Sequence, residues 1–229
     1  MTALYTAVGR FQRKKNKDGQ QYPVVIVNGE EHMVDIPEMI LWTCLNWRIL
    51  TISQIDELYV QKLREVKGTE YAPCENYVKR LIQRGLIVSG VGNTGAETLY
   101  DLLCNLYIVP ADSGLFTKIA AFLKFTLRDG VPFYQAKAVF HIEKLSGDEK
   151  RIMDLAKQAQ LSTAEIIKCV ETGVYDLSSE EKIMNALYDD DFTTSDNIGY
   201  YAELSSKQRP VLVAVSNLYL RKLIIFERI

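Results

Sequence analysis

The sequence is poor in the residues that bind metals or form disulfides. The two histidines, His32 and His141, have no cysteine or histidine neighbour at metal-ligand spacing, and no CxxC motif occurs. Three of the four cysteines fall in apolar helical stripes, where cysteine acts as a small hydrophobic side chain. We therefore expect reduced, buried thiols and neither a metal nor a cofactor. The four are Cys44, Cys74, Cys104 and Cys169.

Long apolar runs and catalytic constellations are also missing. No run approaches the ~20 apolar residues that span a bilayer, and the first basic cluster follows the apolar part, the reverse of a secretory signal. Ser89 lacks the first glycine of a nucleophile elbow, and no catalytic Ser/His/Asp or Cys/His set is indicated. We expect a cytoplasmic protein that is not an enzyme and has no membrane partner. Its 229 residues, 48% of them hydrophobic, fit one large domain or two smaller ones.

An excess of positive charge is absent too, which argues against binding to nucleic acid. The net charge is −2 and the pI is about 5.8, whereas neutralising phosphates supplies much of the affinity for DNA. Local patches nevertheless decide contact. Basic residues gather in 10–17 and at Lys79, Arg80 and Arg84, whereas acidic residues gather in 180–191.

The segment from Ile36 to Pro110 carries the most informative pattern. Apolar spacing predicts one helix from Glu38 to about Trp47, a second after a cap at Thr51 or Ser53, and a third from about Pro73. A strand and a glycine-rich loop follow the third helix. This order of elements is the main evidence for function in the sequence.

The third helix has two distinct faces. Val78, Leu81 and Ile82 form its apolar stripe, and Gly85 suits the left-handed turn that ends a helix. Leu86–Val88 then reads as a short buried strand. The polar residues left for the outer face and the end of the helix are Glu75, Asn76, Lys79, Arg80, Gln83 and Arg84.

A β-hairpin is expected before these helices. Residues 3–12 and 22–28 read as two strands joined by a polar loop, and Asn28-Gly29 can start another tight turn. The loop carries Lys14 and Lys15. It is either an arm for the DNA backbone or a solvated hairpin tip.

Residues 111–229 show mainly helix signals. Ser-x-x-Glu/Gln boxes, which start helices, occur at Ser146/Glu149, Ser162/Glu165, Ser178/Glu181 and Ser205/Gln208. The apolar spacing from Val78 to Ile87 recurs from Val215 to Ile224, which suggests a repeat. Helices over 180–189 and 194–204 would complete a second trihelical unit, with the final KLIIFERI as its strand.

Residues Ile36–Val91 resemble the winged helix-turn-helix superfamily of DNA-binding proteins. The segments TISQIDELYVQKL and YVKRLIQRGLI carry this generic resemblance. In that superfamily the outer face of the third helix reads the major groove, which implies this role for Asn76, Lys79 and Arg80. The loop in the position of the wing has no Lys or Arg, a departure from the usual pattern.

These patterns predict an α+β fold that is mainly α. Residues 1–110 would form an N-terminal β-hairpin plus a winged-helix domain. Residues 111–229 would form an all-helical part that holds a second winged-helix-like unit at 178–229.

The function expected from this arrangement is binding of double-stranded DNA as a transcriptional regulator. The alternatives are a protein-protein interaction module with winged-helix architecture and a replication initiator-like protein of a plasmid or mobile element. A homodimer through the apolar helix 115–127 is a further hypothesis. The expected DNA-binding residues are Asn76, Lys79, Arg80, Gln83, Arg84, Lys14 and Lys15.

The loop Gly90–Gly95 supports one remote alternative, a dinucleotide-binding enzyme. It matches GxGxxG, and Asp112 follows at the distance of a ribose-binding acid. The preceding strand is short and directly follows a helix, and the chain lacks alternating strands and helices. We therefore prefer a plain turn or an imperfect wing.

Overall fold

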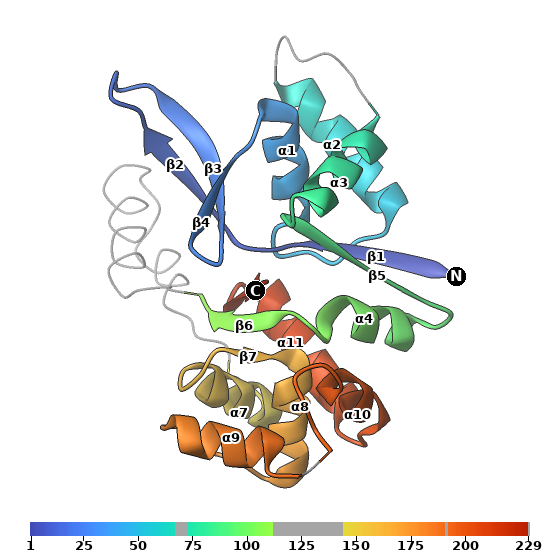
Figure 1. Ribbon diagram of the computed structural model, residues 1–229. Helices are drawn as coiled ribbons and strands as arrows, with labels where there is room; N and C mark the ends of the chain where they lie inside the picture. The colour runs from blue at the N-terminus through green and yellow to red at the C-terminus, as the bar shows by residue number, and fades with distance from the viewer. Residues whose placement is uncertain (67–72, 112–143, 191, 229) are drawn as a thin grey trace.

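The computed structural model describes residues 1–66, 73–111, 144–190 and 192–228 and has an α+β fold (Figure 1). The helix expected at 115–127 lies outside these residues. The elements of the first half are β1 (Thr2–Ala7), β2 (Arg10–Lys15), β3 (Gln21–Val27), β4 (Glu30–Met33), α1 (Ile36–Leu45), α2 (Ile52–Glu65), α3 (Cys74–Gln83), β5 (Ile87–Gly92) and α4 (Gly95–Leu103). Those of the second half are β6 (Tyr107–Pro110), α7 (Gly147–Ala156), β7 (Leu161–Ser162), α8 (Thr163–Thr172), α9 (Glu180–Tyr188), α10 (Ile198–Leu204), α11 (Gln208–Leu220) and β8 (Ile224–Glu227).

The three predicted helices of the first half form, and local signals set their ends. Asp35 caps α1, Thr51 caps α2 and Pro73 precedes α3. Gly85 has a φ of 71°, as expected for the residue that ends α3. The apolar stripe of α3 also faces inward as predicted, since Leu81 is fully buried.

The first strand of the chain completes the sheet that follows α3. β1 pairs antiparallel with β5, from Thr2 opposite Gly92 to Ala7 opposite Ile87, and an antiparallel bridge joins Tyr5 to the segment between α1 and α2. Figure 1 shows α1 and α3 on one side of these strands and α4 on the other. β5 therefore continues into a helix, and the strand beside it comes from the start of the chain.

The N-terminal segment 3–12 is two strands, because the chain turns at Gly9. This residue has a φ of 80°, and an added Cβ would lie 2.2 Å from the carbonyl oxygen of Ile26. Glycine is therefore required here both by the turn and by the close approach. Beyond it, β2, β3 and β4 form a separate antiparallel sheet in that order.

The second half is not all-helical, and this expectation was wrong. β6 pairs antiparallel with both β7 and β8 in a sheet of order β7-β6-β8. The strand at 107–110 therefore belongs with the final strand of the chain. A boundary after residue 110 would separate β6 from both of its partners.

The two halves have the same order of elements. β1, α1, the bridge after α1, α2, α3 and β5 correspond to β6, α7, β7, α8, α11 and β8. The predicted match of α3 with α11 agrees with this order. The helices assigned to 180–189 and 194–204 form as α9 and α10, but they are insertions between α8 and α11 rather than the first two helices of the repeat.

Two local details repeat as well. After α3, Gly85 N–H donates to Ile82 and Leu86 N–H donates to Leu81; after α11, the same pattern joins Lys222 to Tyr219 and Leu223 to Leu218. In each half, a glutamate near the start of one helix pairs with the arginine that ends another. The glutamates follow the caps of α1 and α7 by three residues, and the arginines end α3 and α11. These ion pairs are Glu38–Arg84 at 2.7 Å and Glu149–Arg221 at 2.9 Å.

Two of the four predicted capping boxes form at the predicted residues. Ser146/Glu149 and Ser162/Glu165 cap α7 and α8 reciprocally. α9 is capped by Ser179, one residue later than predicted. Ser205 ends α10 instead of starting a helix, and α11 begins at Gln208, which leaves Pro210 in the first turn, where proline is tolerated.

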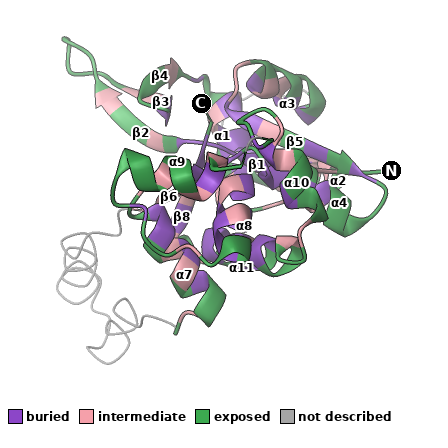
Figure 2. Ribbon diagram, turned by 60° about the horizontal axis from the view of Figure 1, so that its bottom comes forward, coloured by how far each residue is buried: buried purple, intermediate pink, exposed green. Residues whose placement is uncertain are grey.

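Tyr219 of α11 joins the two halves. Its hydroxyl group accepts the Trp47 N–H at 2.9 Å, donates to the Ala7 carbonyl oxygen at 3.2 Å and lies 3.0 Å from the Thr6 hydroxyl. Its ring stacks on Phe226 with the centroids 4.3 Å apart. Figure 2 shows buried residues in both halves, and these belong to one hydrophobic cluster.

Candidate nucleic-acid interface

The outer face of α3 presents polar side chains to solvent. Asn76, Lys79 and Gln83 are exposed, as predicted, because Val78 and Leu81 direct the opposite face into the core. The helix is only ten residues long, so these three side chains extend along most of its length.

Arg80 and Arg84 also lie at this surface, with side chains 52% and 31% exposed, but both are paired with acidic residues. Arg80 donates to Glu38 Oε1 and Asp35 Oδ2, each at 3.0 Å. Arg84 donates to Glu38 Oε2 at 2.7 Å and to the carbonyl oxygen of Met33. Both arginines therefore fix α3 against the start of α1, and neighbouring Glu38 raises the pKa of Arg80.

Glu38 is the residue at this surface that sequence reasoning missed, and it holds α3 against α1. Its side chain is only 1% exposed, and a carboxylate so buried is stable only when it is paired and hydrogen-bonded. It also accepts the Asp35 N–H at 3.1 Å in a capping box. The spacing Asp35-x-x-Glu38, ahead of an apolar helix, was the available signal.

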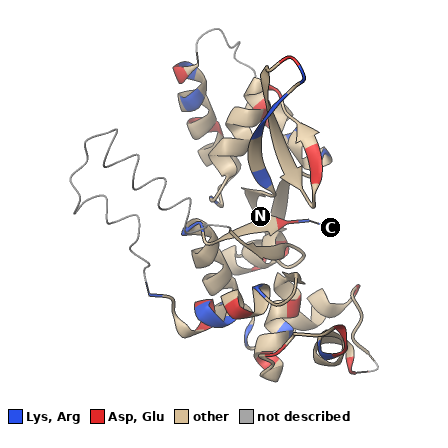
Figure 3. Cartoon of the chain, turned by 90° about the vertical axis from the view of Figure 1, so that its left-hand side faces the viewer, with Lys and Arg blue, Asp and Glu red and all other residues tan. Residues whose placement is uncertain are grey.

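The basic residues of the β2–β3 hairpin lie away from α3. Lys14 forms an ion pair with Glu31 of β4, whereas Lys15 is exposed near the turn. Figure 3 shows Lys and Arg residues along this hairpin with acidic residues beside them. The hairpin therefore offers Lys15 and its basic neighbours as a second surface, separate from the face of α3.

The loop Gly90–Gly95 has neither the form of a wing nor that of a parallel βαβ unit. β5 pairs antiparallel with β1 and then leads into α4. The Asn93 N–H donates to Glu97 at 3.0 Å, and Thr94 caps α4 by accepting the Glu97 N–H at 3.2 Å. The start of α4 is thus closed by side chains of the helix itself.

The glycines of this loop serve packing rather than a left-handed turn. A Cβ on Gly90 would lie 2.3 Å from the backbone nitrogen of Leu102, and one on Gly92 would lie 2.6 Å from that of Thr98. Neither glycine has a positive φ. β5 therefore requires glycine at both positions because the α4 backbone lies directly against it.

We expect Gly90→Ala to lower the free energy of unfolding by about 1–3 kcal/mol, because the added methyl group overpacks a backbone contact. Chemical denaturation would measure this change. Gly95→Ala is the matched control, since a Cβ there meets nothing within 4 Å and its effect should stay below about 1 kcal/mol. Equal effects of the two substitutions would contradict the packing argument.

The cysteines are inert, as expected. All four are buried and free, and burial raises the pKa of Cys104 and of Cys169 to about 11. The thiols therefore stay protonated at neutral pH. Within the described residues, no group of three or more metal-ligating side chains occurs and no helix is long and apolar enough to cross a membrane.

α3 is a short helix that two arginines fix on a buried glutamate. Its other exposed polar side chains are Glu75, Asn76, Lys79 and Gln83. Comparisons with protein-family models, with curated proteins and with solved structures found no match to this chain.

Proposed function

We propose that the protein binds double-stranded DNA, with the exposed face of α3 in the major groove. The observation that carries this proposal is the rigid presentation of Asn76, Lys79 and Gln83 on one helix face. Asparagine and glutamine can bond the edge of adenine, and lysine can bond that of guanine. The three-helix order followed by a strand supports the same proposal as a winged-helix-like arrangement.

In this proposal the cationic side chains have different roles: some contact DNA and others position α3. Lys79 is free to meet a base edge or a phosphate group. Arg80 and Arg84 hold the helix in position through Glu38, and their partly exposed guanidinium groups add positive charge beside the groove. Lys15 at the hairpin supplies a separate phosphate contact.

The second half is not assigned to DNA, although its topology repeats the first. The outer face of α11 carries Val213 and Leu220, which are 49% and 51% exposed, with Asn217 between them. Arg209 lies one turn before Val213 on the same side of the helix, so this face pairs a single arginine with apolar side chains and lacks the amide–lysine–amide set of α3. A transcriptional regulator is the function proposed first, and the repeated topology favours the replication-initiator variant as the alternative among DNA-binding proteins.

Replacing Lys79 with Ala should weaken binding to duplex DNA and reduce the slope of log affinity against log salt by about 1. Asn76→Ala should cost about 1–3 kcal/mol on a preferred sequence. Gel-shift titration at several salt concentrations would measure both. Lys157→Ala is the control, since Lys157 is an exposed lysine at the end of α7. Binding that is equal in all variants, or absent at low salt, would refute the assignment of α3.

A protein-interaction module is the second candidate, and exposed apolar side chains favour it. Met33 and Ile36 are 67% and 51% exposed, and they flank Asp35, the partner of Arg80. An apolar pair of this kind suits a protein surface better than a phosphate backbone. If the DNA titrations fail, this face of α1 and α3 becomes the leading protein contact.

A further inference from the structure

A second exposed surface lies in the other half of the molecule, on α10 and the turn before it. Phe192, Tyr200, Tyr201 and Leu204 are exposed by 74%, 63%, 43% and 68%. We call these four residues the aromatic patch. Exposed apolar side chains gathered on one short helix and the turn before it, three of them aromatic, are typical of a contact site.

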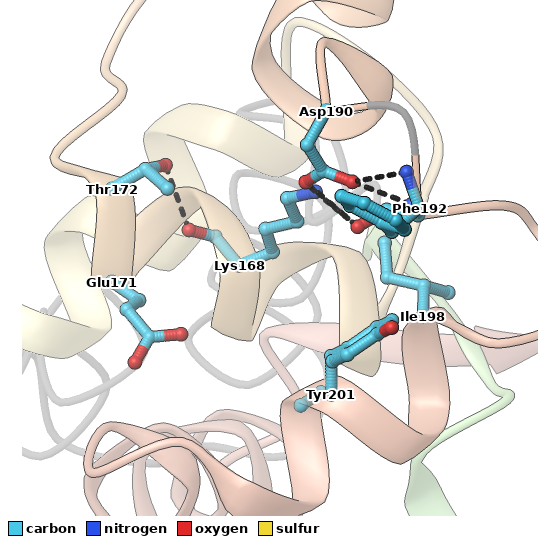
Figure 4. Close-up of a pocket in the computed structure, with 9 residues that line it drawn as sticks. Lys168, Glu171, Thr172, Asp190, Phe192, Ile198 and Tyr201 are labelled. Carbon is cyan, nitrogen blue, oxygen red and sulfur yellow. Dashed lines mark hydrogen bonds and ion pairs between the residues drawn. The ribbon is translucent and has the colours of Figure 1, made fainter.

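The patch borders a pocket of about 360 Å³ between α8 and α10. Figure 4 shows Lys168, Glu171 and Thr172 of α8 on one side and Phe192, Ile198 and Tyr201 on the other. Ile198 is buried and forms part of an apolar wall. The pocket is large enough for one apolar side chain of a partner.

Among the described residues that line the pocket, Lys168 is the one cation, and it is already paired within the protein. Lys168 Nζ donates to Asp190 Oδ2 at 2.7 Å, to Thr193 Oγ1 at 2.9 Å and to the carbonyl oxygen of Leu187 at 2.6 Å. Because an ammonium group has three donors, nothing remains to bind an anionic ligand. The same hydrogen bond from Lys168 holds the pKa of Asp190 well below its usual range.

The charge around the patch is negative. From residue 183 to residue 206 the sequence has five acidic residues and no Lys or Arg. Glu171 lines the pocket without an ion pair among the described residues, and Asp196 and Glu203 are exposed on the turn before α10 and on α10 itself. Such a rim repels phosphate groups and attracts cationic side chains.

The base of the patch is held in place. Tyr100 of α4 donates its hydroxyl group to the carbonyl oxygen of Gly199, and Ala202 is buried against the core. The rings of Tyr200 and Tyr201 lie edge to face, with their centroids 5.8 Å apart. A partner would therefore meet a preformed surface, which lowers the entropic cost of binding.

We propose that the aromatic patch docks a basic segment of a partner protein, with an apolar side chain of that segment in the pocket between α8 and α10. Lys or Arg residues that flank the apolar side chain would meet Glu171, Asp196 and Glu203. Charge complementarity selects a cationic polypeptide over a nucleic acid, and the apolar wall selects one with a hydrophobic anchor. This inference is independent of the DNA-binding role of α3.

A fluorescein-labelled synthetic peptide with a central Leu-Leu pair flanked on each side by Lys and Arg is the probe. Fluorescence anisotropy with the full-length protein should show saturable binding. Tyr201→Ser should weaken it at least about tenfold, as for an interface hot spot. Glu171→Lys should weaken it too and should raise the affinity for the same peptide with Glu in place of Lys and Arg, because the charge at this position is reversed. Circular dichroism checks that both variants fold, which their exposed positions favour.

Two controls accompany these variants. Met184→Ser removes an exposed apolar side chain on α9 outside the pocket and should leave binding unchanged. The peptide with Ser in place of Leu should bind much more weakly. Peptide binding that persists unchanged in Tyr201→Ser would overturn the proposal, and so would the absence of peptide binding at low salt. The proposal would also fail if an oligo-dT probe bound as tightly as the peptide and the peptide displaced it.

Discussion

Replacing Tyr219 with Ala should lower the free energy of unfolding by about 3–5 kcal/mol, the range for deletion of a large buried aromatic side chain. The ring is 1% exposed and stacks on Phe226. Its loss leaves a cavity between α11 and β1. Because Tyr219 bonds to Thr6, Ala7 and Trp47 of the other half, the substitution should also loosen the contact between the halves.

The conservative change Tyr219→Phe separates the hydroxyl group from the ring. It leaves the part-buried Trp47 N–H without its acceptor. A fully buried unsatisfied donor costs about 1–3 kcal/mol, so we expect a loss at the lower end of that range. Urea denaturation followed by circular dichroism would measure both variants. Tyr200→Phe, at an exposed tyrosine, is the control and should change stability by less than about 0.5 kcal/mol. Unchanged stability in Tyr219→Phe would rule out the proposed hydrogen-bonding role.

The second large effect is expected at Glu38. Glu38→Ala removes a buried carboxylate that pairs with Arg80 and Arg84, and breaking a buried ion pair typically costs about 3–5 kcal/mol. The two arginines would keep partial exposure to water, which places the expected value at the lower end of that range. Thermal or chemical denaturation would measure the change.

Glu75→Ala is the matched control for Glu38, because Glu75 is an exposed glutamate at the start of α3. Its effect should stay near zero. The repeat offers a second comparison, since Glu149 pairs with Arg221 in the corresponding position, and Glu149→Ala should destabilise in the same direction. A loss under about 0.5 kcal/mol for Glu38→Ala would mean that the ion pairs add little to stability.

The local signals of the sequence predicted much of the first half. Helical spacing placed Val78 and Leu81 in the core, and Gly85 marked the end of α3. These features depend on residues a few positions apart, where periodicity and turn chemistry act directly. The exposed side chains of Asn76 and Lys79 followed from the same spacing.

The remaining features depend on residues far apart in the sequence. β1 pairs with β5, and β6 pairs with β8 across more than half of the chain, so no local pattern indicated either pairing. Arg80 and Arg84 were assigned to the predicted DNA surface because helical spacing indicates which side of a helix faces outward. It does not indicate which residues of other elements pair with that side. Glu38, some forty residues earlier, is their partner.

The sequence predicted the last helix of the repeat correctly, because α11 corresponds to α3. It predicted the first two helices wrongly, as α9 and α10. The spacing shared by α3 and α11 reflects equal packing in each half. α9 and α10 carry strong helix signals, yet they are insertions. The true counterparts, α7 and α8, are identified by their sheet partners and by the ion pair of Glu149 with Arg221, neither of which a single sequence displays.

The position of Tyr219 has a consequence for biosynthesis. β1 is synthesised well before α11 and β8. Thr6 and Ala7 acquire their contacts with Tyr219, and Gly9 its hydrogen bond to Phe226 at 2.7 Å, only after more than two hundred further residues have been joined. Contacts of such large sequence separation form slowly. Until they form, the unpaired edge and the apolar side chains of a strand remain exposed, which favours chaperone binding and aggregation. β1 therefore obtains all of its partners only long after its own synthesis.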